Sequence, residues 1–244
     1  MRLISIALCL FGGIAYANVP ESQPQHTHDS EDLALEVTAF SGLDSSYFSE
    51  GRDALDGDSL WVNSVELAYG KFSGGVWYGN SPDQDYDELQ IGIGYAESFG
   101  DFEIAVGYTR FQFPFESAHD NEVGTTLTWS NLPMGCEFSA DAYYSFDAEG
   151  YFVELALGHE VEVSENFSLV AAGIAGINQG YVSDGHDGLN NLALRLEGVV
   201  ALAENWHFIS HLTYSWAVDA NPALEGDAQL IDFFHGGFGL EWSF

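Results

Sequence analysis

The feature that most constrains the fold of this chain is an alternation of apolar and polar residues with a period of two, which recurs from Leu33 to Phe244. Residues 88–95, for example, read ELQIGIGY, so that every second side chain is large and apolar. Successive side chains of a β-strand point to opposite faces, whereas those of a helix return to one face every three or four residues. The alternation therefore predicts strands with one apolar and one polar face, and an all-β fold.

Twelve segments of strand length can be recognised in this region. Two of them, 72–79 and 167–177, do not reveal their facing, because the first has no clear pattern and the second is apolar at both parities. An even number of strands lets an antiparallel sheet close with both of its ends on one side. The predicted strands are 33–38, 61–69, 72–79, 88–95, 102–109, 122–129, 137–145, 151–162, 167–177, 191–200, 206–215 and 231–244.

The connections between these segments alternate in length. Bacterial outer-membrane barrels have short periplasmic turns and long extracellular loops, whereas a soluble sandwich has no reason to separate them. We therefore expect one transmembrane, antiparallel up-and-down β-barrel over residues 33–244, with a soluble exported β-sandwich binding module as the alternative. The short turns fall at 70–71, 98–101, 131–135, 164–166 and 203–205, and the longer loops near 49–58, 80–86, 114–121, 178–190 and 218–230, with a shorter one at 146–150.

The start of the chain has the pattern of a secretory signal peptide. Arg2 precedes an apolar run over residues 3–14, and Ala15 and Ala17 form a small-x-small site, so we expect cleavage after Ala17. The run is too short for a spanning helix, which needs about 20 apolar residues. Residues 18–32 are polar and predict a flexible periplasmic lead; its histidines at 26 and 28 could hold a metal ion, but a solvated linker is the preferred interpretation.

The composition excludes several classes of function. The whole sequence has 38 acidic residues against 5 lysines and arginines. Nucleic-acid binding requires clustered cations at the phosphates, so no nucleic-acid partner is expected. Cys136 is the single cysteine beyond the signal peptide, which excludes an internal disulfide in the mature chain.

Carboxylates are concentrated on the polar faces of the predicted strands. Eleven acids share the parity of the polar face, whereas Arg195 is the one strong cation that does so. Burying so many charges in a dry core would be prohibitive, whereas a water-filled lumen accommodates them. We therefore predict an acidic lumen. The predicted pore-lining residues are Glu36, Glu66, Glu88, Glu103, Glu122, Glu137, Asp141, Glu154, Glu160, Arg195, Glu197 and Glu241.

Residue types that could support catalysis are present, but their spacing is unfavourable. Ser210 falls on the opposite face of its strand from His207 and His211, so a Ser–His pair cannot form there. The two histidines are four residues apart, roughly 13 Å in a strand, which is too far to share a metal ion. His159 shares its face with apolar residues. We expect no enzyme activity, no catalytic residue and no cofactor.

Acidic residues are also grouped in three loops. Hard cations such as calcium take oxygen ligands, but none of these groups has the complete spacing of a calcium loop. Weak binding of divalent cations by the loops stays open, and solvation of the surface is the alternative. The groups are Asp53, Asp56 and Asp58; Asp83, Asp85 and Asp87; and Asp184, His186 and Asp187.

The segment 239–244 resembles the closing strand of bacterial outer-membrane barrels. Their assembly signal has a glycine followed by two aromatic residues, which Gly239, Trp242 and Phe244 match. The resemblance implies that the barrel-assembly machinery is a partner of this chain. The six tryptophans lie near the ends of predicted strands, which fits two aromatic girdles at the membrane interfaces.

The hairpin around 88–108 adds a resemblance to a family. Residues 88–95, Gly100-Asp101-Phe102-Glu103 and Val106-Gly107-Tyr108 resemble the TorF-type porins of Gram-negative bacteria, with similarity from about residue 60 onward. The resemblance implies an outer-membrane channel and identifies no substrate. We therefore expect passive diffusion of small solutes with a preference for cations. A non-conducting structural or adhesive barrel is the alternative.

Overall fold

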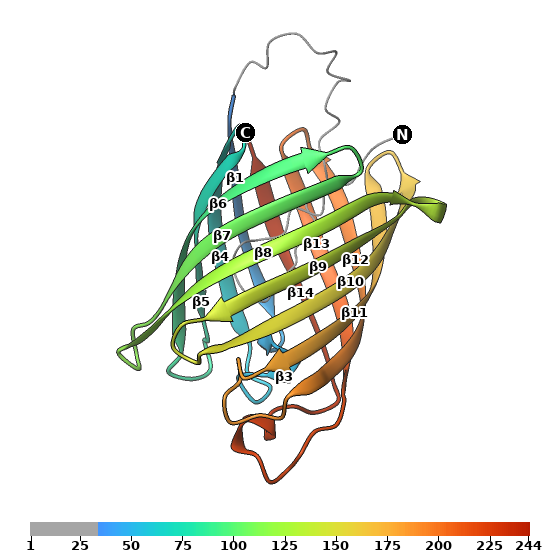
Figure 1. Ribbon diagram of the computed structural model, residues 1–244. Helices are drawn as coiled ribbons and strands as arrows, with labels where there is room; N and C mark the ends of the chain where they lie inside the picture. Colours follow the sequence, from blue (N-terminus) through green and yellow to red (C-terminus); the bar gives the residue numbers. More distant parts are fainter. Residues whose placement is uncertain (1–33) are drawn as a thin grey trace.

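The computed structural model describes residues 34–244, which form a closed antiparallel β-barrel of twelve strands (Figure 1). The signal peptide 1–17 with its site at Ala15 and Ala17, the lead 18–32 and its two histidines lie outside the described residues. The barrel strands are β1 (Leu35–Asp44), β4 (Leu60–Tyr69), β5 (Phe72–Asn80), β6 (Asp87–Phe99), β7 (Phe102–Phe113), β8 (Ala118–Leu132), β9 (Cys136–Ser145), β10 (Gly150–Ser164), β11 (Phe167–Gln179), β12 (Gly188–Ala203), β13 (Trp206–Ala217) and β14 (Phe233–Ser243).

Strands β1 and β14 close the barrel. They pair antiparallel from Thr38 opposite Ser243 to Asp44 opposite Gly237, and two further backbone hydrogen bonds of 2.8 and 2.9 Å join Val37 and Phe244. Every other strand pairs with its neighbours in sequence. The closed sheet excludes the sandwich alternative and confirms the predicted barrel.

The two ends of the barrel differ as the loop lengths predict. In Figure 1 the short turns lie at the end that carries the carboxyl terminus, and the long loops lie at the opposite end. One turn contains a 3-10 helix, η1 (Pro133–Gly135), and a long loop contains η2 (Glu225–Asp227). No helix within residues 34–244 is long and apolar enough to cross a membrane.

The outer face of the barrel is apolar. Large apolar side chains at every second position are exposed, for example Ile91, Ile93 and Leu194, and 64% of Ile93 is accessible. A closed barrel satisfies all of its strand hydrogen bonds internally, so such a face is suited to lipid. The architecture is therefore that of a membrane-spanning barrel.

Five of the six tryptophans follow the predicted girdles, and one does not. Trp61, Trp129, Trp206, Trp216 and Trp242 are exposed on the outer face. Trp77 is only 4% exposed and points into the barrel, so its predicted place in a girdle is wrong. The reason is that β5 turns Phe72 and Val76 outward, which places Trp77 on the inner face.

The structure resolves the two strands whose facing the sequence leaves open. In β5, Val76 lies opposite the outward Ile91 and Trp77 opposite the inward Gln90. In β11, Ala172 lies opposite the inward Arg195, so the even-numbered residues of that strand face inward. Most strands are longer than predicted, because the pairing continues beyond the last alternating apolar residue.

Candidate functional site in the barrel lumen

The twelve predicted pore-lining residues all lie at inward positions of their strands. Residues that face each other across a strand pair share a side of the sheet. Two of the predicted residues, Asp141 and Glu154, lie opposite each other, and Glu66 lies opposite Thr38 of β1. Their surroundings differ, since Glu36 is exposed near the short-turn end whereas Glu88 and Glu197 are buried inside the barrel. That they line a conducting pore remains a prediction.

One half of the lumen, which we call the carboxylate wall, consists of the inward acids on β4 to β10. Glu88 illustrates how they are held: its carboxylate accepts hydrogen bonds from Tyr47 Oη at 3.0 Å, Tyr86 Oη at 2.5 Å and Gln90 Nε2 at 2.5 Å. Glu122 accepts a hydrogen bond from Tyr181. These donors are neutral, so they leave the charge of each carboxylate uncompensated. The acids of the wall are Glu66, Glu88, Glu103, Asp120, Glu122, Glu137, Asp141, Glu154, Glu160 and Glu162.

The other half, which we call the histidine wall, consists of the inward ionisable residues on β1 and β12 to β14. Each of three carboxylates here has a base beside it. Arg195 lies 2.7 Å from Glu197, His211 lies 2.9 Å from Asp44, and His207 Nδ1 lies 3.5 Å from Glu241 without a hydrogen bond. The wall consists of Glu36, Asp44, Arg195, Glu197, His207, His211, His235 and Glu241.

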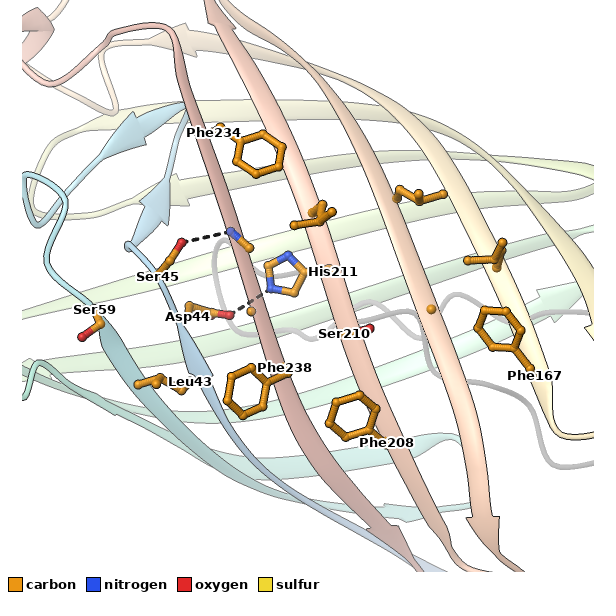
Figure 2. A pocket seen from close by; sticks show the side chains of 16 residues that line it. Leu43, Asp44, Ser45, Ser59, Phe167, Phe208, Ser210, His211, Phe234 and Phe238 are labelled. Carbon is orange, nitrogen blue, oxygen red and sulfur yellow. Dashed lines mark hydrogen bonds and ion pairs between the residues drawn. The ribbon is translucent and has the colours of Figure 1, made fainter.

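The Asp44–His211 pair depends on a glycine between its two strands. Asp44 is on β1 and His211 on β13, with β14 between them, and a Cβ at Gly237 would overlap Asp44 Oδ1. Figure 2 shows the contact across β14, together with the bond from the Gly236 N–H to Ser45 Oγ. On the outer side of this wall a shallow groove runs between Phe208, Phe238 and other apolar side chains.

Asp44 and His235 are inward residues that were not predicted, because the first predicted strand ends at residue 38 and residue 235 has no predicted facing. The alternation alone is sufficient to place both, since Asp44 has the same parity as Glu36 and His235 has the same parity as Glu241. Glu50 and Arg52 were not predicted either, because they lie in a loop.

That loop, residues 45–59, is the main difference from the predicted site; we call it the mouth segment. The sequence places an acidic, solvated loop at 49–58, but the segment folds into the long-loop end of the barrel and contains a short hairpin, β2 (Phe48–Ser49) and β3 (Arg52–Asp53). It folds inward because its apolar side chains have partners there. Tyr47 and Leu55 are buried against the inward Leu60, Val62 and Trp77.

The mouth segment contacts opposite sides of the lumen. On one side Tyr47 stacks on Trp77 with ring centres 6.3 Å apart, and on another Phe48 stacks on His235 at 5.0 Å. Tyr143 Oη of β9 donates a hydrogen bond of 3.2 Å to Glu50. The segment therefore crosses the mouth of the barrel and narrows it.

Arg52 fastens the mouth segment to the neighbouring loops. Its guanidinium donates to Asn190 Oδ1 at 2.9 Å and to the Gly226 carbonyl at 2.6 Å, and it forms an ion pair of 3.1 Å with Asp227. The side chains of Arg52 and Asp227 are 7% and 0% exposed. Asp227 also accepts a bond of 2.8 Å from His186 Nδ1. We call the Arg52–Asp227 pair the latch.

The charges of the mouth region have shifted pKa values. Burial raises the pKa of Glu50, and the hydrogen bonds from Ser49 and Tyr143 and the charge of Arg52 only partly oppose this effect. Burial acts in the same direction on Asp227, but hydrogen bonds from the Asn221 N–H and from His186 outweigh it, so the pKa of Asp227 is lowered. The latch therefore keeps its anion to low pH, whereas Glu50 is poised to take up a proton.

Two of the loop acids hold loop segments through hydrogen bonds, and a third is buried. Asp83 accepts a bond of 2.6 Å from Ser59 Oγ, Asp187 accepts one of 2.8 Å from the Gly180 N–H, and Asp53 is buried rather than solvated. Within residues 34–244 no three histidine, cysteine or acidic side chains are grouped so that they could hold a metal ion. Weak binding of divalent cations by the loops stays a prediction.

The histidines and the serine of β13 are placed as the alternation predicts. Ser210 is paired with the outward Phe238, whereas His207 and His211 face inward. The serine and the two histidines are therefore on opposite sides of the wall.

The residues of the predicted assembly signal lie where the barrel closes. Trp242 and Phe244 point outward with ring centres 4.2 Å apart. Gly239 faces inward beneath the ring of Phe40 on β1, which occupies the space that a Cβ would need. The glycine is therefore required by the packing at the closing seam, whereas its role in assembly stays a prediction.

Comparisons with known proteins identify the fold. No protein-family model matches the sequence, and no curated protein is similar to it in sequence. The KdgM porin is similar in structure with a TM-score of 0.58 at 9% identity, over 86% of this chain and 99% of that chain. A KdgM porin in complex with disordered oligogalacturonate gives 0.57 at 8% identity over the same shares, and the NanC porin gives 0.51 at 9% identity, again over 86% and 99%. The fold is that of outer-membrane porins, and the apolar outer face places the barrel in the bacterial outer membrane.

Proposed function

We propose that this protein is an outer-membrane channel for the passive diffusion of small solutes, with a preference for cations. The observation that supports the proposal is the inward position of ten acids on β4 to β10, of which Glu88 and Glu122 accept hydrogen bonds from neutral donors. On the histidine wall Arg195 offsets the charge of Glu197. The net charge facing the lumen is therefore negative.

The selectivity follows from the field in the lumen. Clefts and channels lined by one sign of charge focus the field and raise the local concentration of counter-ions. Salt screens this effect with a Debye length of about 10 Å at 0.1 M. The preference for cations is therefore strong at low salt, fades toward 1 M salt, and weakens below about pH 4.5, where accessible carboxylates become protonated.

The same charges disfavour polyanions. Oligogalacturonate, which is named with the KdgM porin, carries a carboxylate on each sugar unit. An acidic wall repels such a chain, so the solutes proposed here are small cations and small neutral molecules. Within this proposal the chain is a TorF-type porin whose closing strand is recognised by the barrel-assembly machinery; the hairpin at 88–108 and the motif at Gly239, Trp242 and Phe244 support these two points.

The experiment is a measurement of the reversal potential of the refolded protein in a planar bilayer under a potassium chloride gradient. The proposal predicts single channels whose reversal potential has the sign of cation selectivity at low salt. Folding is checked independently by heat-modifiable migration on SDS gels, because a closed hydrogen-bond ladder resists SDS until it is boiled. Anion selectivity, or no selectivity, at low salt and neutral pH would contradict the proposal.

A non-conducting structural or adhesive barrel is the second candidate, and the mouth segment favours it. Residues 45–59 cross the long-loop end and are fastened by the latch. A folded, heat-modifiable barrel that shows no channels in either the wild type or a latch variant would support this candidate.

A further inference from the structure

We propose that Asp141 and Glu154 form a binding site for an aliphatic ammonium ion in the lumen, on the short-turn side of the mouth segment. The proposal rests on the proposed channel function only for its biological meaning, because binding can be measured without conduction. The solutes that the site would bind during their passage through the channel are organic amines.

The two carboxylates face each other directly. Asp141 on β9 and Glu154 on β10 are partners in the register, and both point inward. Directly opposed residues in a sheet have Cβ atoms about 5 Å apart, at which distance like charges destabilise the pair. A cation bound between the two side chains would remove this repulsion.

One oxygen of the pair has no partner in the described structure. Asp141 is only 7% exposed, and its Oδ1 forms no hydrogen bond, although the Thr126 hydroxyl bonds to the same carboxylate. A buried carboxylate oxygen without a donor is costly, and such atoms are rare unless an unseen group satisfies them. Glu154 is half-buried, so a solute in the lumen can reach the pair.

The surrounding charges do not fill the site. Glu50 on the mouth segment is a further acid that acts on Glu154, and Arg195 is the cation that acts on it. Arg195, however, donates to Glu197 from Nε at 3.2 Å and from a terminal nitrogen at 2.7 Å. Its guanidinium is therefore held by another carboxylate.

The arrangement suits an ammonium ion better than a metal ion. Magnesium and calcium require six or more oxygen ligands, and within residues 34–244 no three acidic, histidine or cysteine side chains gather as a metal site. An ammonium group has three N–H donors and no acceptor, which two carboxylates can satisfy.

Aromatic rings close the site on the side of the mouth. Tyr143 and Phe152, the next inward residues on the same two strands, stack with ring centres 5.7 Å apart, and Tyr181 packs edge-on against Tyr143 at 5.1 Å. Apolar rings next to a charge pair exclude water, which strengthens the attraction. They also provide an apolar surface for the methylene groups of an alkylamine.

The test is isothermal titration of putrescine into the refolded full chain in detergent at low salt. The double variant Asp141→Asn with Glu154→Gln removes both charges and keeps the shapes of the side chains. We expect saturable binding to the wild type and an affinity at least ~10-fold lower for this variant, because two charge-assisted hydrogen bonds are lost. The matched control, Glu36→Gln with Glu66→Gln, removes two inward charges elsewhere and should change the affinity less than about twofold.

The outcomes separate this site from the channel proposal. Absence of saturable binding to the wild type, or an equal loss in both double variants, would overturn the site even if the channel prefers cations. If magnesium displaced putrescine at concentrations below those at which putrescine itself binds, the assignment of the site to an amine would be overturned. Binding that depends on Asp141 and Glu154 in a barrel that does not conduct would leave the site standing and refute the channel. Heat-modifiable migration of each variant shows that it is folded.

Discussion

The two walls of the lumen hold their carboxylates in different ways. Of the ion pairs within residues 34–244, those that join two inward strand residues all lie on the histidine wall. On the carboxylate wall Glu88 and Glu122 accept hydrogen bonds from hydroxyl and amide groups. Both walls have the same alternating pattern in sequence, so the difference depends on which residues the register brings together.

The comparison indicates what each wall does. On the histidine wall Arg195 compensates Glu197 within β12, whereas the pairs Asp44–His211 and His207–Glu241 join β13 to β1 and to β14. An acid held by neutral donors keeps its charge, so the carboxylate wall generates the field of the lumen. Stability is therefore expected to depend more on the histidine wall, and selectivity more on the carboxylate wall.

The largest effect on stability is expected when a base is removed from the histidine wall. Arg195→Met leaves Glu197, which is 1% exposed, without its partner. Removing one partner of a buried ion pair lowers the free energy of unfolding by about 3–5 kcal/mol. The measurement is the urea concentration at which the refolded barrel loses its heat-modifiable form.

The comparison variant is Tyr181→Phe, which removes a neutral donor from Glu122 on the carboxylate wall. This variant should lower the free energy of unfolding by about 1–3 kcal/mol, because one hydrogen bond to a buried acceptor is lost. If Tyr181→Phe lowered the free energy of unfolding as much as Arg195→Met does, the two walls would not differ in their contribution to stability.

A large effect on conductance is expected from opening the latch. Arg52→Ala leaves Asp227 buried without its guanidinium, so the mouth segment loses its main attachment to the neighbouring loops. Single-channel conductance should rise at least about twofold, since a segment crossing the mouth limits the current. The control is Lys71→Ala, which breaks an exposed ion pair with Glu97 and should change nothing measurable. Equal conductance in all three proteins would show that the segment does not limit the current.

The closing seam of the histidine wall provides an intermediate effect. Phe244→Asp places a charge in the outward aromatic pair with Trp242, beside β1. We expect less assembled barrel while export continues, because the altered residue lies in the predicted assembly signal. The amount of heat-modifiable protein in the outer-membrane fraction measures this effect, and normal assembly would show that the motif is coincidental.

A smaller effect is expected from pH. Because burial raises the pKa of Glu50 in the inserted mouth segment, insertion is most stable below the ordinary glutamate range. This stability is lost as the pH rises through the raised pKa. Conductance should therefore increase from pH 4.5 to pH 8, and Glu50→Gln should make it less dependent on pH. An increase of the same size in the variant would assign the effect to other groups.

The sequence predicts the barrel well because its lipid-facing residues repeat. Ile91 and Ile93 must face lipid whatever their neighbours are, so the alternation alone predicts the strands, their facing and the even count. The facing of β11 cannot be predicted in this way, because small residues such as Ala171 and Ala172 are tolerated on either face. Trp77 could not be placed either, since its strand has glycines at several positions and no clear parity.

The mouth segment and the Asp44–His211 pair could not be predicted, because both depend on distant contacts. Arg52 and Asp227 are 175 residues apart, and Asp44 and His211 are 167 apart. Neither pair has a local pattern. Their positions follow only from the closed register and, for Asp44, from the space left by Gly237.

Whether the inward carboxylates make the channel cation-selective is tested most directly by neutralising the carboxylate wall and measuring the reversal potential at low salt. The triple variant Glu66→Gln, Glu103→Gln and Glu160→Gln removes three half-buried inward charges. The matched control, Glu116→Gln, Asp147→Asn and Asp219→Asn, removes three exposed charges from loops at the long-loop end of the barrel. The wall variant is expected to lose about half or more of the cation selectivity, since the field comes from the lining charges, while the control retains it. Unchanged selectivity in the wall variant, or an equal loss in the control, would show that the lining carboxylates do not set the selectivity.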